Sequence, residues 1–215
     1  MNKKLGRKSG FFYVYEQSVE HFASLFNLID LTWKKMIKFT LKLISGGEKM
    51  DLSKLSTVYN IRRMGEDDAS LILDLENGNP LYFNYCPPKP SKQSVLNDLQ
   101  ALPEGKNMDD KFYIGFFNEN RLVAIMDFIV SFPTKETIYI GLFMMNCKES
   151  GQGKGSLIIN EVLKAFREEG FIKVRLAYMK GNPQSKRFWE KCGFTEIGIE
   201  KENEHGKAVV LEKVL

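Results

Sequence analysis

The chain has 215 residues, 43% of them hydrophobic, which suffices for one good core and hardly more than one domain. Its net charge of +4 is uneven, because residues 1–49 hold nine Lys/Arg against four Asp/Glu and residues 50–215 hold 22 against 23, so the main domain lacks the basic face that nucleic acid requires. Two histidines and three widely spaced cysteines exclude most zinc, redox and histidine-dependent hydrolase sites, and predict a reduced cytoplasmic protein without a metal.

The first 49 residues form a basic segment of their own. Apolar residues from Tyr15 to Leu43 recur at three-four spacing, which predicts an amphipathic helix. Lysines interrupt the run of apolar residues in this helix, so no stretch approaches the roughly 20 consecutive apolar residues of a transmembrane segment. Three interpretations stay open: the helix packs on the domain, pairs with its own copy in a homodimer, or lies on a membrane surface. The tract 45–49 resembles a translated ribosome-binding site, which makes Met50 an alternative start. We therefore expect an extension at 1–49 and a main domain at 50–215.

The main domain shows alternating strand and helix patterns. Short connections between three β segments predict an antiparallel meander. Asn182 is a natural N-cap, and Pro183 is favourable at the first position of the helix that follows. The expected strands are 58–63, 111–118, 121–132, 136–146, 172–178, 194–200 and 207–215, and the expected helices begin near 66, 91, 156 and 183.

An aromatic cluster lies between two segments rich in proline, glycine and asparagine. Residues 77–80 and 86–90 frame the cluster Tyr82, Phe83 and Tyr85. Such a connection is either a plain surface loop or the mouth of a substrate site.

A glycine-rich turn separates the meander from the next helix. Residues 150–156 read Ser-Gly-Gln-Gly-Lys-Gly-Ser, in which Gly155 stands where a Walker loop needs Ser or Thr. A dinucleotide fingerprint would need a third glycine at Ser156. Glycines still allow backbone N–H groups to approach phosphate oxygens at the positive end of a helix. The turn is therefore either a pyrophosphate site or a purely structural turn.

The residues downstream favour the pyrophosphate site. Asn182 and the run Phe-Trp-Glu-Lys-Cys-Gly-Phe at 188–194 follow the turn at a suitable distance. Together they resemble the GNAT superfamily of acyl-CoA-dependent N-acetyltransferases over about residues 57–215, with Gly153 and Gly155 as signature glycines. Ser150 and Trp189 depart from the family, which prefers Gln or Arg and often Tyr there. The resemblance implies an α/β (mixed α+β) GNAT fold, with a mostly antiparallel sheet of six to seven strands and about four helices.

The resemblance also implies an acetyl-CoA site. The fourth strand should diverge from the fifth, with Gly141 easing a bulge, and leave a slot for pantetheine. Backbone groups around Phe143 and Met145 should bind the pantetheine amides and face the thioester oxygen. The implied CoA-binding residues are Phe143, Met144, Met145, Gly151, Gln152, Gly153, Lys154, Gly155, Ser156, Asn182, Ser185 and Trp189.

The catalytic residues are harder to assign. Trp189 cannot protonate the departing thiolate, which leaves Tyr178 as a substitute acid or water as the proton source. Asp127 and Glu136 are candidate bases, although a carboxylate on or beside a β segment is more often a structural or solvated residue. The expected reaction is direct attack by a primary amine of an unidentified small molecule or peptide. The alternative is a non-catalytic acyl-CoA-binding or sensor module.

Overall fold

The computed structural model describes residues 50–203 and 206–215. The predicted N-terminal helix and the extension at 1–49 lie outside these residues. Within the described ranges, no helix combines the length and the apolar character needed to cross a membrane.

A seven-stranded sheet forms the centre of the domain, with strand order β1-β2-β3-β4-β5-β7-β6. All neighbouring strands are antiparallel except β4 and β5, which run parallel. This confirms the predicted meander and the mixed, mostly antiparallel sheet. The strands are β1 (Asn60–Arg63), β2 (Lys111–Asn118), β3 (Arg121–Ile129), β4 (Thr137–Met145), β5 (Lys173–Met179), β6 (Thr195–Asn203) and β7 (Gly206–Val214).

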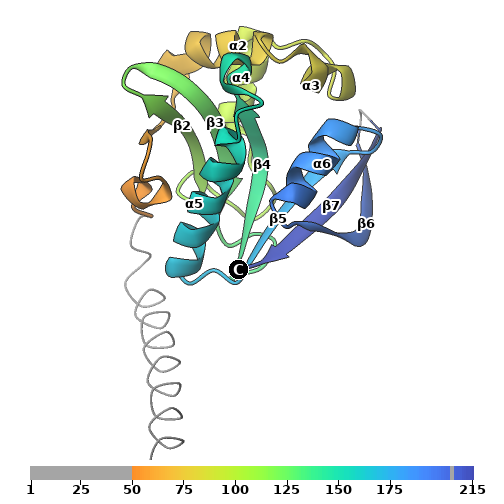
Figure 1. Ribbon diagram of the computed structural model, residues 1–215. Helices are drawn as coiled ribbons and strands as arrows, with labels where there is room; N and C mark the ends of the chain where they lie inside the picture. Colours follow the sequence, from red (N-terminus) through yellow and green to blue (C-terminus); the bar gives the residue numbers. More distant parts are fainter. Residues whose placement is uncertain (1–49, 204–205) are drawn as a thin grey trace, which may run out of the picture. The chain divides into compact units, whose positions relative to one another are not determined.

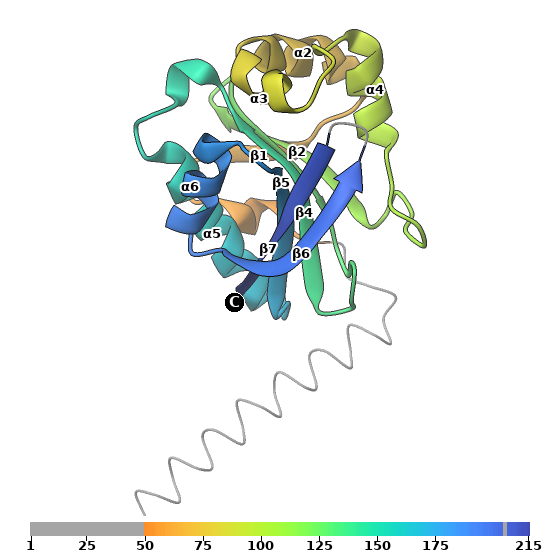
Figure 2. The same ribbon diagram turned by 90° about the vertical axis from the view of Figure 1, so that its right-hand side faces the viewer.

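Helices cover both faces of this sheet (Figure 1). Figure 2 shows α5 and α6 together on one side. On the other face, α2 and α4 pack over the middle strands through a second apolar cluster that includes Ile72, Val95 and Met144. The α-helices of the described part are α2 (Ala69–Asn77), α3 (Pro80–Tyr85), α4 (Lys92–Gln100), α5 (Lys154–Glu168) and α6 (Pro183–Lys191), with short 3₁₀-helices η1 (Leu52–Leu55), η2 (Glu66–Asp68) and η3 (Cys147–Glu149).

The coverage on both faces explains the composition of β2. Seven of its eight residues are buried, because alternate side chains enter different cores. Phe112 and Ile114 pack against the α5 side, whereas Tyr113 and Phe117 pack against the α2 side. A strand buried on both faces is a nearly continuous apolar run, and this is the pattern that the sequence shows at 111–118.

The aromatic segment after α2 differs from the expected open connection, because it forms the helix α3. Pro80 occupies the first turn, where its missing N–H costs no hydrogen bond. The N–H of Cys86 donates to the carbonyl of Tyr82 and closes the helix at 3.0 Å. Two prolines follow and prevent its continuation.

The core of the α5 side makes a first prediction. Phe166 has no exposed surface and packs on Phe128 with ring centroids 5.0 Å apart. We expect Phe166→Ala to lower the free energy of unfolding by about 3–5 kcal/mol, because the cavity left behind cannot be refilled. Leu157 lies on the same helix with 43% of its surface exposed, so Leu157→Ala should cost well under about 1 kcal/mol. Urea denaturation of the full chain measures both, and equal losses would contradict the assignment of this core.

Candidate functional site

The two parallel strands separate midway along their length. β4 and β5 pair from Thr137 with Lys173 to Ile140 with Leu176, and no further. Beyond that point β4 stays paired with β3 as far as Met145, and β5 stays paired with β7. A gap therefore opens between residues 141–145 and 177–179, where the sequence analysis expected one.

A bulge at Gly141 causes this separation. Asp127 on β3 pairs with Leu142 and the next residue, Phe128, pairs with Ile140, so Gly141 is the extra residue on β4. A β-carbon at Gly141 would lie 3.4 Å from Asp127 Oδ2, in close contact. Because a bulge bends its strand and increases the local twist, β4 turns away from β5 here.

The edge of β4 that faces the gap carries free backbone groups. The N–H of Asn146 donates to the Val123 carbonyl on β3, at 2.7 Å. Since N–H and C=O groups of alternate residues point to the same edge, those of Phe143 and Met145 point away from β3 and into the gap. The Met145 carbonyl accepts a hydrogen bond there from Asn79 Nδ2, at 3.0 Å. The remaining groups on this edge are available to a ligand.

The glycine-rich turn places a second set of free amides beside this gap. Gly151 and Gly153 both have φ of +78°, a left-handed conformation that glycine adopts without steric cost. None of the N–H groups from Gly151 to Ser156 donates to an acceptor in the described part of the chain. They surround the start of α5, where the helix dipole is positive. This arrangement suits a pyrophosphate.

Close packing holds α5 against its neighbours. A β-carbon on Gly155 would come within 3.3 Å of the Phe188 ring and 3.4 Å of Met145 Cγ. Glycine at this position therefore lets α5 approach both α6 and β4, which brings the turn to the end of the gap.

Both sets of backbone groups open into one cavity of about 1170 Å³. The turn, the β4 edge and α6 form one part of its wall, and α2, α3 and α4 form another. Of the residues predicted from the sequence, the cavity is lined by Tyr82, Phe83, Phe143, Met144, Met145, Gly151, Gly153, Gly155, Ser156, Tyr178, Asn182, Ser185 and Trp189. Gln152, Lys154, Tyr85, Asp127 and Glu136 are not among the lining residues.

The residues on α6 are held in defined positions. Asn182 Oδ1 caps the helix by accepting from the Ser185 N–H at 3.0 Å. Trp189 is buried and lies edge-on to Phe188 and Phe194, with ring centroids 4.9 and 5.3 Å apart. The indole therefore forms a rigid apolar wall beside the gap.

Lys154, which the sequence placed near the phosphates, is engaged elsewhere. Its ammonium group forms a short ion pair with the buried carboxylate of Glu149. Arg121 Nη1 also contacts Glu149, at 3.0 Å. Binding of an anion at the turn would therefore depend on backbone amides rather than on this lysine.

The candidate acid and bases lie at three different places. The Tyr178 hydroxyl donates to Glu196 on β6 at 2.8 Å, away from β4, and burial and this bond raise the pKa of Tyr178. Asp127 Oδ2 lies 2.7 Å from Lys111 Nζ, and burial raises the pKa of Asp127 although the lysine opposes this. Glu136 precedes β4, at the end of the strand where β4 and β5 are still paired. Their catalytic roles stay predictions.

A carboxyl group that the sequence analysis did not select lines the cavity instead. Glu76 is only 3% exposed and lies on the buried face of α2 beside Ile72 and Leu75. Burial, and next the nearby charge of Asp98, raise the pKa of Glu76 to about 7. The signal was present in the sequence, because a glutamate interrupts the apolar stripe of a helix.

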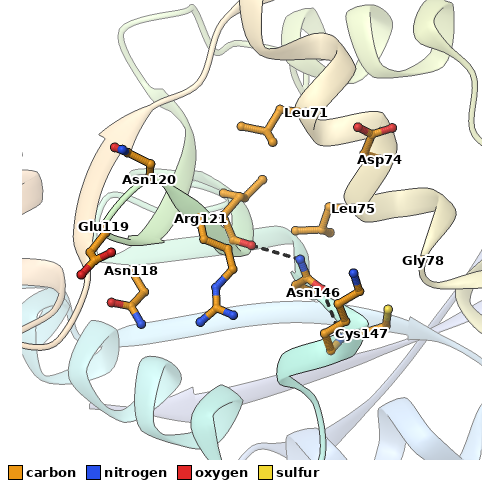
Figure 3. A pocket seen from close by; sticks show the side chains of 12 residues that line it. Leu71, Asp74, Leu75, Gly78, Asn118, Glu119, Asn120, Arg121, Asn146 and Cys147 are labelled. Carbon is orange, nitrogen blue, oxygen red and sulfur yellow. Dashed lines mark hydrogen bonds between the residues drawn. The ribbon is translucent and has the colours of Figure 1, made fainter.

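A second cavity, of about 860 Å³, lies on another side of α2 (Figure 3). It is lined by Leu71 and Asp74 of α2, by the β2–β3 turn and by η3. Asn146 spans it, with Nδ2 donating to the Leu122 carbonyl at 3.2 Å and Oδ1 accepting from the Lys148 N–H at 3.1 Å. No residue chosen from the sequence lines this cavity.

Comparison with known proteins identifies the family. The sequence model of the acetyltransferase (GNAT) family matches residues 76–194, which is more than half of the 215 residues. The chain belongs to the GNAT acetyltransferase family. The match begins at Glu76 and includes the bulge, the glycine turn and α6, and membership supports acetyl transfer in general. A search of curated proteins found no matching relative.

Solved structures confirm the GNAT fold. An acetyltransferase from Thermus thermophilus is 19% identical, with a TM-score of 0.58 over 74% of this chain and 97% of its own. A Vibrio cholerae spermidine N-acetyltransferase, in complex with CoA and spermine, is 17% identical, with a TM-score of 0.56 over 74% of this chain and 96% of its own. Aminoglycoside acetyltransferase AAC(6')-Ib, in complex with coenzyme A and kanamycin, is 16% identical, with a TM-score of 0.57 over 73% of this chain and 94% of its own.

The environment of Glu76 predicts how stability depends on pH in this GNAT protein. Since the pKa rises from 4.5 to about 7 on folding, the folded state holds more protons than the unfolded state between these values. Ionisation of Glu76 therefore destabilises the fold as pH rises through this window. We compare the free energy of unfolding of Glu76→Gln with that of wild type. We expect this difference to favour the variant by on the order of 1–3 kcal/mol more at pH 8 than at pH 5.

Thermal unfolding of the full chain at the two pH values measures this difference. Asp74→Asn is the matched control, because Asp74 is exposed on the same helix and outside the main cavity. A Glu76→Gln effect that is identical at pH 5 and pH 8 would show that the carboxyl group ionises freely in the folded protein.

Proposed function

We propose that this GNAT protein is an N-acetyltransferase that transfers the acetyl group of acetyl-CoA to a primary amine. One observation carries the proposal: the free edge of β4 and the free amides of the turn open into the same cavity. A ligand with amide groups at one end and a pyrophosphate at the other matches this arrangement. Coenzyme A is such a ligand.

The residues present fit this group. The N–H groups from Gly151 to Ser156 would hold the pyrophosphate, as expected from the sequence. The backbone of Phe143 and Met145 would hold the pantetheine amides at the β4 edge, although Asn79 already occupies the Met145 carbonyl. Trp189, Ser185 and Asn182 would form the opposite wall.

Bound acetyl-CoA supplies an activated acetyl group, and the chain supplies position and electrostatics. The amine nitrogen forms a bond to the acetyl carbonyl carbon, the carbon–sulfur bond breaks, and the amine loses one proton. A backbone N–H at the β4 edge stabilises the negative charge that develops on the carbonyl oxygen. The thiolate takes a proton from water, since a thiol of pKa about 8.5 is a tolerable leaving group near neutral pH.

The structural neighbours support an amine acceptor. The Vibrio cholerae enzyme is a spermidine N-acetyltransferase crystallised with spermine, and AAC(6')-Ib was crystallised with kanamycin. Their low identity makes them guides to the reaction type and not to the acceptor of this chain.

A pair of matched glycine substitutions tests the pyrophosphate site. Gly153 precedes α5 and Gly170 follows it; both have a left-handed φ, and at neither position would an added β-carbon have a neighbouring atom within 4 Å. Alanine at either position should therefore cost a similar ~1–2 kcal/mol of stability. Only Gly153→Ala should weaken CoA binding, by roughly ten-fold, because it displaces the amides. Calorimetric titration of the full chains with CoA measures this, and equal affinities for both variants would contradict the proposed site.

Release of CoA thiol during incubation with acetyl-CoA and a panel of amines tests the reaction itself. Amine-dependent release with one acetylated product per thiol supports the transferase. Binding of acetyl-CoA without turnover of any amine would instead favour the non-catalytic acyl-CoA-binding or sensor module. No affinity for CoA or acetyl-CoA would overturn both.

The position of the Tyr178 hydroxyl predicts that it is not the acid. Because it donates to Glu196 and points toward β6, Tyr178→Phe should change kcat by less than about three-fold. Steady-state kinetics with saturating acetyl-CoA checks this, and a hundred-fold loss of kcat with unchanged thermal stability would restore Tyr178 as the proton donor.

A further inference from the structure

The cavity walls differ in charge, and this difference points to the kind of amine that the site accepts. We propose that Glu76 and Asp98 form an acidic acceptor site, which takes a primary amine that carries a second cationic group, and that Glu76 accepts the proton of the attacking amine. This inference rests on the proposed acetyl transfer and specifies its acceptor.

The wall formed by α2, α3 and α4 is acidic. Of the described residues that line the cavity, those between 76 and 98 include two carboxylates and no lysine, arginine or histidine. The rest of the lining carries the free amides of the turn, which suit the phosphates, and the charged residues Lys191, Lys201 and Glu202. An acceptor that enters between α2 and β4 therefore meets negative charge, and a cation is the complementary ligand.

Glu76 lies within one helical turn of the gap. The N–H of Asn79 donates to the Glu76 carbonyl at 2.8 Å, and Asn79 Nδ2 donates to the Met145 carbonyl on the gap edge of β4. This pair of bonds ties the end of α2 to the strand along which the thioester would lie. Figure 1 shows α2, α3 and α4 at the end of the sheet toward which β4 runs. Glu76 and this edge of β4 therefore line the same cavity.

Neither carboxylate of this site has a cation at ion-pair distance among the described residues, although the charge of Lys111 lowers the pKa of Asp98 against the larger effect of burial. Glu76 and Asp98 form no ion pair or side-chain hydrogen bond with any residue in the described ranges. Asp127, by contrast, has its own cation, because Lys111 is buried beside it with Nζ at 2.7 Å from Oδ2. A cationic acceptor would supply the ion-pair partner that Glu76 and Asp98 lack among the described residues.

The groups around Glu76 favour its role as a base. Asp98 on α4, Tyr82 on α3 and Tyr113 on β2 all interact with it electrostatically, and the nearest buried ammonium, Lys111, is paired with Asp127. Burial, and next the charge of Asp98, raise the pKa of Glu76 to about 7. A base with a pKa near the working pH combines a useful ionised fraction with the capacity to hold a proton.

The same charges exclude other acceptors. An amine with a carboxylate at its far end would place that carboxylate against Asp98, without a lysine or arginine on this wall to receive it. A simple alkylamine would leave Asp98 without a partner. The site therefore ranks amines by the charge at the end opposite to the reacting nitrogen.

Three acceptors of matched length test this ranking: 1,4-diaminobutane, 1-aminobutane and 4-aminobutanoate. With the full chain and saturating acetyl-CoA, we expect kcat/KM to fall in that order, by about five-fold or more at each step. Asp98→Asn should raise KM for the diamine about five-fold and leave KM for 1-aminobutane within two-fold. Preference for 4-aminobutanoate, or no turnover of any of the three by a chain that binds acetyl-CoA, would overturn the proposal.

Glu76→Gln tests the proton transfer. It should lower kcat for the diamine by about 10²–10⁴-fold and remove the acidic limb of the kcat–pH profile, with the Kd for acetyl-CoA unchanged. Asp74→Asn, on the same helix but outside this cavity, should leave kcat and the pH profile as in wild type. A Glu76→Gln enzyme that keeps both kcat and the acidic limb would show that Glu76 is not the base.

Binding and turnover keep the two proposals separable. Wild-type chain that fails to bind acetyl-CoA would remove the transferase, and the acceptor site would fall with it. Wild-type chain that acetylates amines without the expected charge ranking and without dependence on Glu76 would retain the transferase and reject the acceptor site alone.

Discussion

The separation of β4 from β5 is the constraint on which the rest of the site depends. Four residue pairs hold the two strands together, and the extra residue at Gly141 then turns β4 away while its pairing with β3 continues. A polar backbone edge is left open inside the domain, where an unpaired N–H or C=O group is costly. A ligand with its own amide groups can satisfy that edge. The bulge therefore leaves backbone groups without hydrogen-bond partners along an edge where a bound ligand would supply them.

The neighbouring elements are arranged around this gap. Glycine at 155 lets α5 pack closely on α6 and β4, so the free amides of the turn lie at one end of the cavity. Asn79 bonds to the Met145 carbonyl and brings the end of α2 to the same strand. The proposed phosphate donors of the turn and the proposed base Glu76 thus lie on separate elements that line one cavity with β4.

Burial affects the carboxyl groups of Asp127 and Glu76 differently. Asp127 is accompanied by Lys111, and such a pair costs desolvation but leaves little net charge. Glu76 is buried without a neighbouring cation, so its carboxyl group holds its proton more strongly and its pKa rises to about 7. The sequence alone does not show which of the two residues is the better candidate base, because each is an acidic residue within an apolar pattern. Their partners, and not their own chemistry, separate a structural ion pair from a candidate base.

Local patterns in the sequence determined most of the elements and the glycine-rich turn. The apolar run 111–118, the Asn-Pro start at 182 and the glycines of 150–156 act through backbone propensity and periodicity, which need only neighbours along the chain. Only the tertiary structure decided which acidic residue faces the cavity and that residues 80–85 form a helix in its wall. The reason is physical: the pKa and the accessibility of a side chain depend on groups from α4, β2 and β4 that are distant in sequence and become neighbours only after folding.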